Sequence, residues 1–128
     1  MKQLINTPLA PKPVGPYSQG NVHRNMLYVS GQIGIDMVNG GMPNDFHAQA
    51  RNALYNLKSV VEAAGSHMSR VLKVTVYLTD AADFEALNEE YFRFFPENYP
   101  ARETVVVAGL PKDAKCEVSC IAYVREDQ

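Results

Sequence analysis

Two charged residues stand within predicted β-structure between Pro100 and Tyr123, where sheet formation alone would not require them. Arg102 lies at the entrance of one strand, and Glu117 lies inside the next. The planar guanidinium of an arginine can bind a carboxylate through two parallel N–H groups, although a plain surface arginine is the simpler alternative. A glutamate in an apolar strand either pairs with a basic group or stands in a partly desolvated cleft, where a raised pKa suits proton exchange with water. This stretch is therefore the first candidate for function.

The two strands of this stretch, 103–107 and 116–124, are expected to be joined as a hairpin by the turn at 109–113. In the second strand, Glu117 belongs to a mixed face, and the opposite face is unbroken and apolar. The apolar face consists of Cys116, Val118, Cys120, Ala122 and Val124. One face of this strand is thus predicted to lie in the core.

The elements that must position these residues follow from hydrophobic periodicity. Helical spacing predicts one helix over 45–64, capped by Asn44 or Asp45 and ended by Gly65, and a second from Asp80 to just before Pro96. The second helix is expected to bury Phe84, Leu87, Tyr91 and Phe94 or Phe95. Alternating residues predict strands over 26–33 and 71–78, and 3–5 could form a short edge strand. In 71–78, the expected inward side chains are Leu72, Val74, Val76 and Leu78.

These elements predict an α+β fold in which two helices cover one face of a mixed sheet. The other face is too apolar for plain solvent surface and too polar for an ordinary core, so another copy of the chain is the economical partner. Gly31, within the strand over 26–33, suggests a bulge or the close approach of another group. With 128 residues and no repeat or linker, we expect residues 1–128 to form a single domain.

The charge and hydropathy of the sequence argue against several classes of function. The formal charge is -2, with no cluster of basic residues, so nucleic acid is not an expected partner. No apolar run is long enough to cross a bilayer and the first residues lack the core of a secretory signal, so a cytoplasmic protein is expected, with an organelle left open. Cys116 and Cys120, about 13 Å apart along a strand, are expected to stay unpaired.

The other candidates for chemistry lack the spacing that known sites require. The three histidines have no pair at metal-ligand spacing, and no zinc pattern occurs. The glycines form neither a dinucleotide fingerprint nor a phosphate-binding loop. Ser30 is not in a nucleophile elbow, which disfavours a serine hydrolase. We therefore expect neither a metal nor a cofactor.

Six short motifs, in this order and spacing, carry a family resemblance over nearly the whole chain. They are Val14-Gly-Pro-Tyr17, Ser30-Gly-Gln-Ile33, Gln49-Ala-Arg51, Glu62-Ala-Ala-Gly65, Pro100-Ala-Arg102 and Leu110-Pro-Lys-Asp113. The chain resembles the RidA/YjgF family of reactive intermediate deaminases. The resemblance implies a chorismate-mutase-like fold and a homotrimer, with sheets around a central barrel and three clefts between neighbouring subunits.

The same resemblance implies an activity and the residues that carry it. The family hydrolyses enamines and imines, such as 2-aminoacrylate and 2-iminobutanoate, to 2-keto acids and ammonia. Its carboxylate-binding arginine matches Arg102, and the glutamate that positions or activates water matches Glu117. Residues that line the cleft match Tyr17, Ser30, Gly31 and Asn88, and the amide of Thr104 adds a hydrogen bond. Thr104 replaces a cysteine found in many members, so hydrolysis should survive and thiol redox behaviour there should not.

Two other readings remain open at this stage. The clefts could bind small carboxylates without catalysis, in a chaperone-like trimer, although such binding would need Arg102 and not Glu117. An endoribonuclease or translation inhibitor is disfavoured by the acidic charge balance. Asn88 could equally be a buried amide satisfied by backbone. We further expect Arg102 of one chain to meet Glu117 of its neighbour across a subunit boundary.

Overall fold

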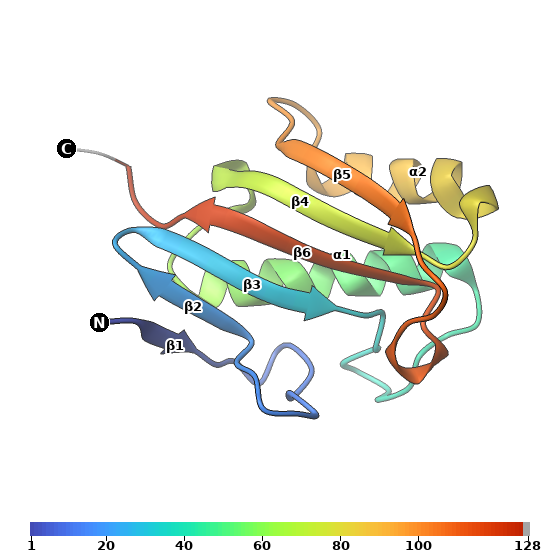
Figure 1. The fold of residues 1–128 in the computed structure, drawn as a ribbon, viewed down its shortest axis with the longest axis horizontal. Coiled ribbons are helices and arrows are strands. Elements are labelled where there is room, and N and C mark those ends of the chain that lie inside the picture. Colours follow the sequence, from blue (N-terminus) through green and yellow to red (C-terminus); the bar gives the residue numbers. More distant parts are fainter. Residues whose placement is uncertain (127–128) are drawn as a thin grey trace.

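The computed structural model describes residues 1–126, which form one six-stranded sheet with two helices packed on one face (Figure 1). The strands are β1 (Gln3–Ile5), β2 (Gly20–His23), β3 (Met26–Gln32), β4 (Val71–Leu78), β5 (Ala101–Val106) and β6 (Cys116–Tyr123). Their order across the sheet is β1-β2-β3-β6-β4-β5. Strands from both ends of the described chain thus share one sheet.

The expected hairpin of β5 and β6 is wrong. β4 lies between them and pairs with β6 antiparallel and with β5 parallel. The cause is the crossover through α2 (Phe84–Phe94), which brings the chain back along the outer side of β4. The apolar face of β6 also favours a central position, since it is flanked by β3 and β4, whereas the more exposed β5 forms an edge.

Both predicted helices are present on the same side of the sheet (Figure 1). α1 spans Phe46–Ala63, and the Asp45 side chain accepts a hydrogen bond from the amide of Ala48, as expected for its cap. Gly65 follows α1 with a φ of 85°, a conformation that glycine adopts at little cost. A short 3₁₀ turn, Ala81–Asp83, capped by Asp80, leads into α2, which spans Phe84–Phe94.

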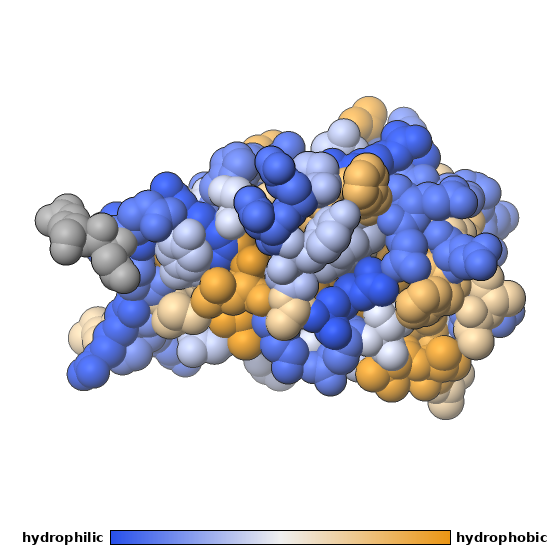
Figure 2. Space-filling model, turned by 90° about the horizontal axis from the view of Figure 1, so that it is seen from above, coloured by the Kyte–Doolittle hydropathy of each residue, from blue (hydrophilic) through white to orange (hydrophobic). Residues whose placement is uncertain are grey.

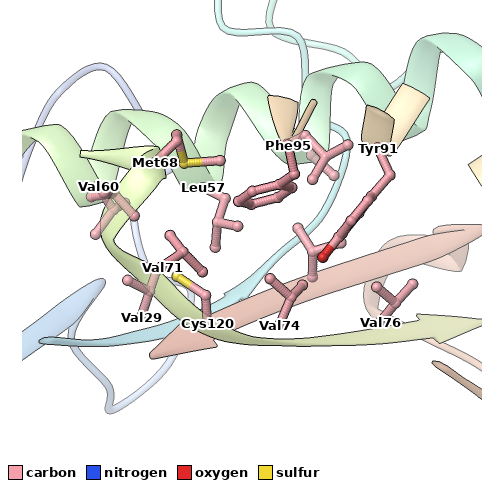
Figure 3. Close-up of a cluster of buried hydrophobic side chains, with 14 of the residues drawn as sticks. Val29, Leu57, Val60, Met68, Val71, Val74, Val76, Tyr91, Phe95 and Cys120 are labelled. Carbon is pink, nitrogen blue, oxygen red and sulfur yellow. The ribbon is translucent and has the colours of Figure 1, made fainter. Parts of the chain in front are cut away.

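The core lies between the helices and the sheet. Figure 3 shows Tyr91 extending from the second helix toward Val74 of β4, with the ring of Phe95 beside Leu57 of α1. The apolar face predicted for β6 is buried throughout, and its two cysteines are free thiols. Two expectations fail here. Leu72 is exposed because the register of β4 against β6 shifts between Val71 and Lys73, and Phe84 is exposed at the first turn of α2.

The face of the sheet away from the helices stays uncovered within the chain. It presents Tyr28, Tyr77 and Ile121, which alternate along their strands with buried residues, and Val105 of the more exposed strand β5. Polar groups are mixed among them, including an ion pair of 2.7 Å between Lys73 and Glu103. Hydrophobic patches among charged surface are also visible from above the sheet edge (Figure 2). The mixed character expected from the sequence is confirmed.

Candidate functional site

Glu117 points out of the uncovered face of the sheet into a small pocket of about 140 Å³. On β6 it stands opposite Tyr77 of β4, and Tyr17, Gly31 and Lys112 line the pocket with it. Among residues 1–126, its carboxylate has neither a hydrogen bond nor an ion pair. Partial burial raises its pKa above the ordinary value, because the loss of hydration disfavours the charged form.

Gly31 makes room for this carboxylate. The register of β3 against β6 shifts between Val29 and Gln32, which confirms a bulge around Gly31. A Cβ on Gly31 would lie only 2.5 Å from Oε2 of Glu117. Any side chain at this position would therefore displace the Glu117 carboxylate.

Ser30 and Gln19 fix the loop that carries Tyr17. The Ser30 hydroxyl donates to the carbonyl of Ser18 at 2.6 Å, and its amide donates to the carbonyl of Gln19 at 2.9 Å. The buried Gln19 side chain accepts from the amide of Thr7 at 2.7 Å and donates to three carbonyls of the proline-rich segment. Because the Ser30 hydroxyl proton is already used, this hydroxyl can offer a ligand only its acceptor lone pairs.

Arg102 is held by aromatic rings instead of by an acid. Its guanidinium carbon lies 4.7 Å from the ring centroid of Tyr91 and 5.6 Å from that of Phe84. No acidic side chain or carbonyl among residues 1–126 accepts a hydrogen bond from it. Cation–π contacts use the face of the guanidinium and leave its N–H groups free in the plane. This arrangement suits bidentate capture of a carboxylate.

Arg102 opens onto a second pocket, of about 320 Å³, which has a largely aromatic lining. Asn88 lines it, together with Phe92, Tyr99 and Pro100. Tyr91 forms part of its wall, and burial raises the pKa of the Tyr91 phenol to about 12, so this ring stays neutral at physiological pH. The structure therefore groups Asn88 with Arg102, and Tyr17 and Gly31 with Glu117.

The register of the strands places Arg102 and Glu117 on opposite faces of the sheet. Arg102 pairs with Val74, which is buried beneath the helices, whereas Glu117 pairs with Tyr77 on the uncovered face. Residues paired across neighbouring strands share a face, and successive residues alternate. Thr104, opposite Val76, is half-buried on the helix side. The two charges therefore do not meet around one small molecule within a single chain.

Several contributors were missed in the sequence. Phe84 and Tyr91 were expected only as core residues, yet both contact the Arg102 guanidinium. Their separation of seven residues places two rings on one helical face, which was the available signal. Lys12 and Lys112 also line the pocket of Glu117; Lys112 belongs to the motif at 110–113 but was not expected in the site, and Lys12 had no recognisable pattern.

Other kinds of site have no support in the described part of the chain. Residues 1–126 contain no group of three His, Cys, Asp or Glu side chains placed to hold a metal ion. Across the same residues, none of the helices combines the length and apolarity that crossing a membrane requires.

The comparison with known families decides the relationship. Residues 7–124 match the family described as Endoribonuclease L-PSP. The chain belongs to this family, which is the YjgF/RidA family. It is 44% identical over 124 residues to a 2-iminobutanoate/2-iminopropanoate deaminase of the mite Dermatophagoides farinae, covering 96% of this chain and 97% of that protein.

Solved structures agree with the fold. The crystal structure of Escherichia coli TdcF with bound serine superposes with a TM-score of 0.92 at 42% identity, covering 97% of this chain and 99% of that one. RidA from an Antarctic Psychrobacter superposes with a TM-score of 0.91 at 43% identity, covering 94% and 98%. The expected α+β fold of the YjgF/RidA family is confirmed.

Proposed function

We propose that the protein is a hydrolytic deaminase that converts 2-enamino and 2-imino acids, such as 2-aminoacrylate and 2-iminobutanoate, to 2-keto acids and ammonia. The observation that carries the proposal is that neither Arg102 nor Glu117 has an ionic partner among residues 1–126. An unpaired guanidinium suits a substrate carboxylate, and a carboxyl group with a raised pKa suits proton exchange. The deaminase named among the relatives supports this reaction.

The reaction needs only orientation, a water molecule and a path for protons. Arg102 binds the substrate carboxylate, and the Glu117 carboxylate takes a proton from water as the water oxygen attacks the protonated imine carbon. The same proton then passes to the nitrogen of the tetrahedral intermediate. The C–N bond breaks and ammonia leaves, and the hydroxyl group gives its proton back to the Glu117 carboxylate as it becomes the carbonyl. For an enamine, protonation at carbon comes first, and protonated Glu117 is the group placed to supply it.

We further propose that each site is shared between two subunits of a homotrimer. The uncovered apolar side chains of the sheet support a neighbour on that face, and the opposite placement of Arg102 and Glu117 supports a site made by two chains. The serine bound to TdcF supports a site for a small carboxylate. We also propose a cytoplasmic location, since two free buried thiols fit a reducing compartment.

The test is an assay in which a dehydratase generates 2-iminobutanoate and the disappearance of the imine is followed. Arg102→Ala should mainly raise KM, and Glu117→Gln should lower kcat about 10²- to 10⁴-fold. Each variant is checked for oligomer mass, so that loss of assembly is not mistaken for loss of chemistry. Wild-type rates in both variants would refute the deaminase proposal.

Subunit mixing tests the shared site separately. When the two impaired variants are dissociated together and reassembled at equal amounts, a shared site regains both residues in about one quarter of positions. Variants reassembled alone are the control and should keep their reduced kcat/KM. If mixing restores nothing although mixed oligomers form, each site belongs to one chain, and the shared-site proposal fails while the reaction stands.

The family description also names an endoribonuclease. The two activities separate cleanly, because RNA cleavage should fall steeply with salt, whereas imine hydrolysis needs no phosphate contact. A non-catalytic carboxylate binder would retain keto-acid binding in Glu117→Gln and would never accelerate imine loss. Salt-sensitive RNA cleavage by the pure protein, without imine hydrolysis, would favour the endoribonuclease.

A further inference from the structure

A buried ion network joins the two helices on the side of the sheet opposite Glu117. Glu90 of α2 is only 2% exposed, and both of its carboxylate oxygens are engaged. Arg51 donates from Nε at 3.0 Å and from Nη2 at 3.2 Å, and Nδ1 of His47 lies at 2.9 Å. The single negative charge of Glu90 thus balances the positive charge of Arg51, and other cations nearby leave an excess of positive charge.

The excess charge faces a pocket of about 240 Å³ between the helices. Arg51, Lys58 and Arg93 line this pocket, and no acidic side chain is among its lining residues. Lys58 has no ion pair or hydrogen bond among residues 1–126, and Arg93 is only loosely placed, at 3.6 Å from Glu90. In a chain with a formal charge of -2, three cations around one small pocket are a local concentration of positive charge.

His67 supplies a further donor to the same pocket. Its Nδ1 accepts a hydrogen bond from the amide of Ser69 at 3.1 Å. In the neutral ring, the proton must therefore be on Nε2. A neutral His67 then offers an N–H group to an acceptor in the pocket, beside the three cations.

The other wall of the pocket is aromatic. The rings of Tyr55 and Phe94 pack edge to face, with centroids 5.0 Å apart, and Tyr55 is 53% exposed. The pocket therefore combines several donors to an oxyanion with an accessible ring that can pack against a flat group.

We propose that this pocket, which we call the helix-seam pocket, binds a small phosphate monoester that carries a planar ring, such as a nucleoside monophosphate. A phosphate dianion matches an excess of positive charge better than a monocarboxylate does, and its three oxygens can use guanidinium, ammonium and imidazole donors together. The ring packs on Tyr55. The helix-seam pocket lies on the helix layer, so a subunit covering the other face of the sheet leaves it open.

Titrations of the full-length protein with AMP, inorganic phosphate and adenosine, followed by NMR, test the proposal. AMP should shift the resonances of His67 and Tyr55, phosphate should shift His67 at higher concentration, and adenosine should bind most weakly. Lys58→Glu should weaken AMP binding about tenfold or more, since it replaces one charge-assisted contact by a repulsion. Lys2→Glu makes the same charge change at an exposed site and should change affinity less than about twofold.

Two further measurements keep the outcome specific. Lys58→Gln should also weaken AMP binding. If its melting temperature is unchanged, the weaker binding of Lys58→Glu cannot be ascribed to misfolding. Arg102→Ala should leave AMP affinity unchanged. The proposal is overturned if AMP fails to shift His67 and Tyr55, if Lys58→Glu and Lys2→Glu weaken binding equally, or if Arg102→Ala abolishes it. Deaminase turnover should be retained in Lys58→Gln, so the test is independent of the proposed reaction.

Discussion

Charged side chains around Glu90 are paired in the seam between the two helices, whereas Arg102 and Glu117 are unpaired among residues 1–126. In the seam, Glu90 is almost fully buried, and burial alone would raise its pKa, but hydrogen bonds from Arg51 and His47 outweigh burial and lower it. Glu117 has a larger exposed fraction, yet its pKa is raised, because burial is not offset by a hydrogen bond or ion pair from any residue that the structure describes. The surroundings of a carboxylate, more than its depth, thus decide its protonation.

The two arginines show the same contrast. Arg51 directs its N–H groups at a carboxylate of its own chain, whereas Arg102 lies against two rings and its N–H groups have no hydrogen-bond acceptor within the described range 1–126. If both arginines served stability, we would expect each of them to have a carboxylate partner. The pairing in the seam is structural, and the unpaired charges are those that we assign to substrate.

The strongest test of this contrast is Glu90→Gln. The variant leaves Arg51 and His47 without their carboxylate, and we expect a loss of about 1–3 kcal/mol in the free energy of unfolding near neutral pH, moderated because both partners are partly exposed. Since the pKa of Glu90 is lowered from 4.5, its stabilisation is complete above that value and is lost as the pH falls. The wild-type advantage should therefore shrink in acid.

Urea denaturation of wild type and variant over a pH series measures this difference. Glu89→Gln is the matched control, because Glu89 is the residue next to Glu90 on the same helix. Its side chain is 71% exposed, and its contact with His47 is long, at 3.9 Å. The control should lose little at any pH. An equal loss in both variants, or a Glu90→Gln deficit that is constant down to strong acid, would contradict the role given to the network.

An intermediate effect is expected at the rings that hold Arg102. Phe84→Leu removes one ring from the guanidinium but keeps an apolar side chain at an exposed position. An exposed cation–π contact contributes about 0.5–1 kcal/mol, so kcat/KM for the imine should fall about two- to fivefold, through KM more than kcat. Phe84→Tyr should restore it.

Phe92→Leu is the control for that experiment. Phe92 lines the same pocket and is 56% exposed, but its ring makes no contact with the Arg102 guanidinium of the kind made by Phe84 and Tyr91. Equal losses in Phe84→Leu and Phe92→Leu would show that the pocket needs apolar bulk and that the cation–π contact contributes nothing.

Local signals in the sequence predicted the elements well and their arrangement poorly. The periodicity and cap of α1 and the alternation of β6 depend on neighbours in the chain, and both are confirmed. The order of the strands depends on the crossover through α2, so the β5–β6 hairpin was wrong. β2, four residues long and partly polar, was not predicted, and a single register shift moved Leu72 to the surface.

For the candidate site too, local sequence indicated the residues but not their arrangement in space. Arg102 and Glu117 could be named as candidates from the sequence, because sheet formation does not require an arginine at a strand entrance or a glutamate among apolar strand residues. Their placement on opposite faces depends on pairing with β4, a strand far away in the sequence. The sequence predicted that another group could lie close to Gly31, but it could not show that this group is the Glu117 carboxylate.

The smallest expected effect concerns stability at Glu117. Its raised pKa means that the folded chain binds a proton more readily than the unfolded chain, so stability falls as the pH rises from the ordinary value of 4.5 through the folded pKa. Glu117→Gln removes this cost, and the variant should be slightly more stable than wild type at neutral pH, by less than about 1 kcal/mol. The gain should vanish in acid, where both side chains are neutral.

Denaturation at fixed protein concentration, with Glu97→Gln as a surface control of equal charge change, resolves this difference. A gain in Glu117→Gln and not in Glu97→Gln, together with the loss of turnover, would mean that Glu117 is retained at the expense of stability. A variant less stable than wild type at neutral pH would instead reveal that the assembled protein gives Glu117 a partner. The contrast with Glu90 would then vanish, because both carboxylates would be structural.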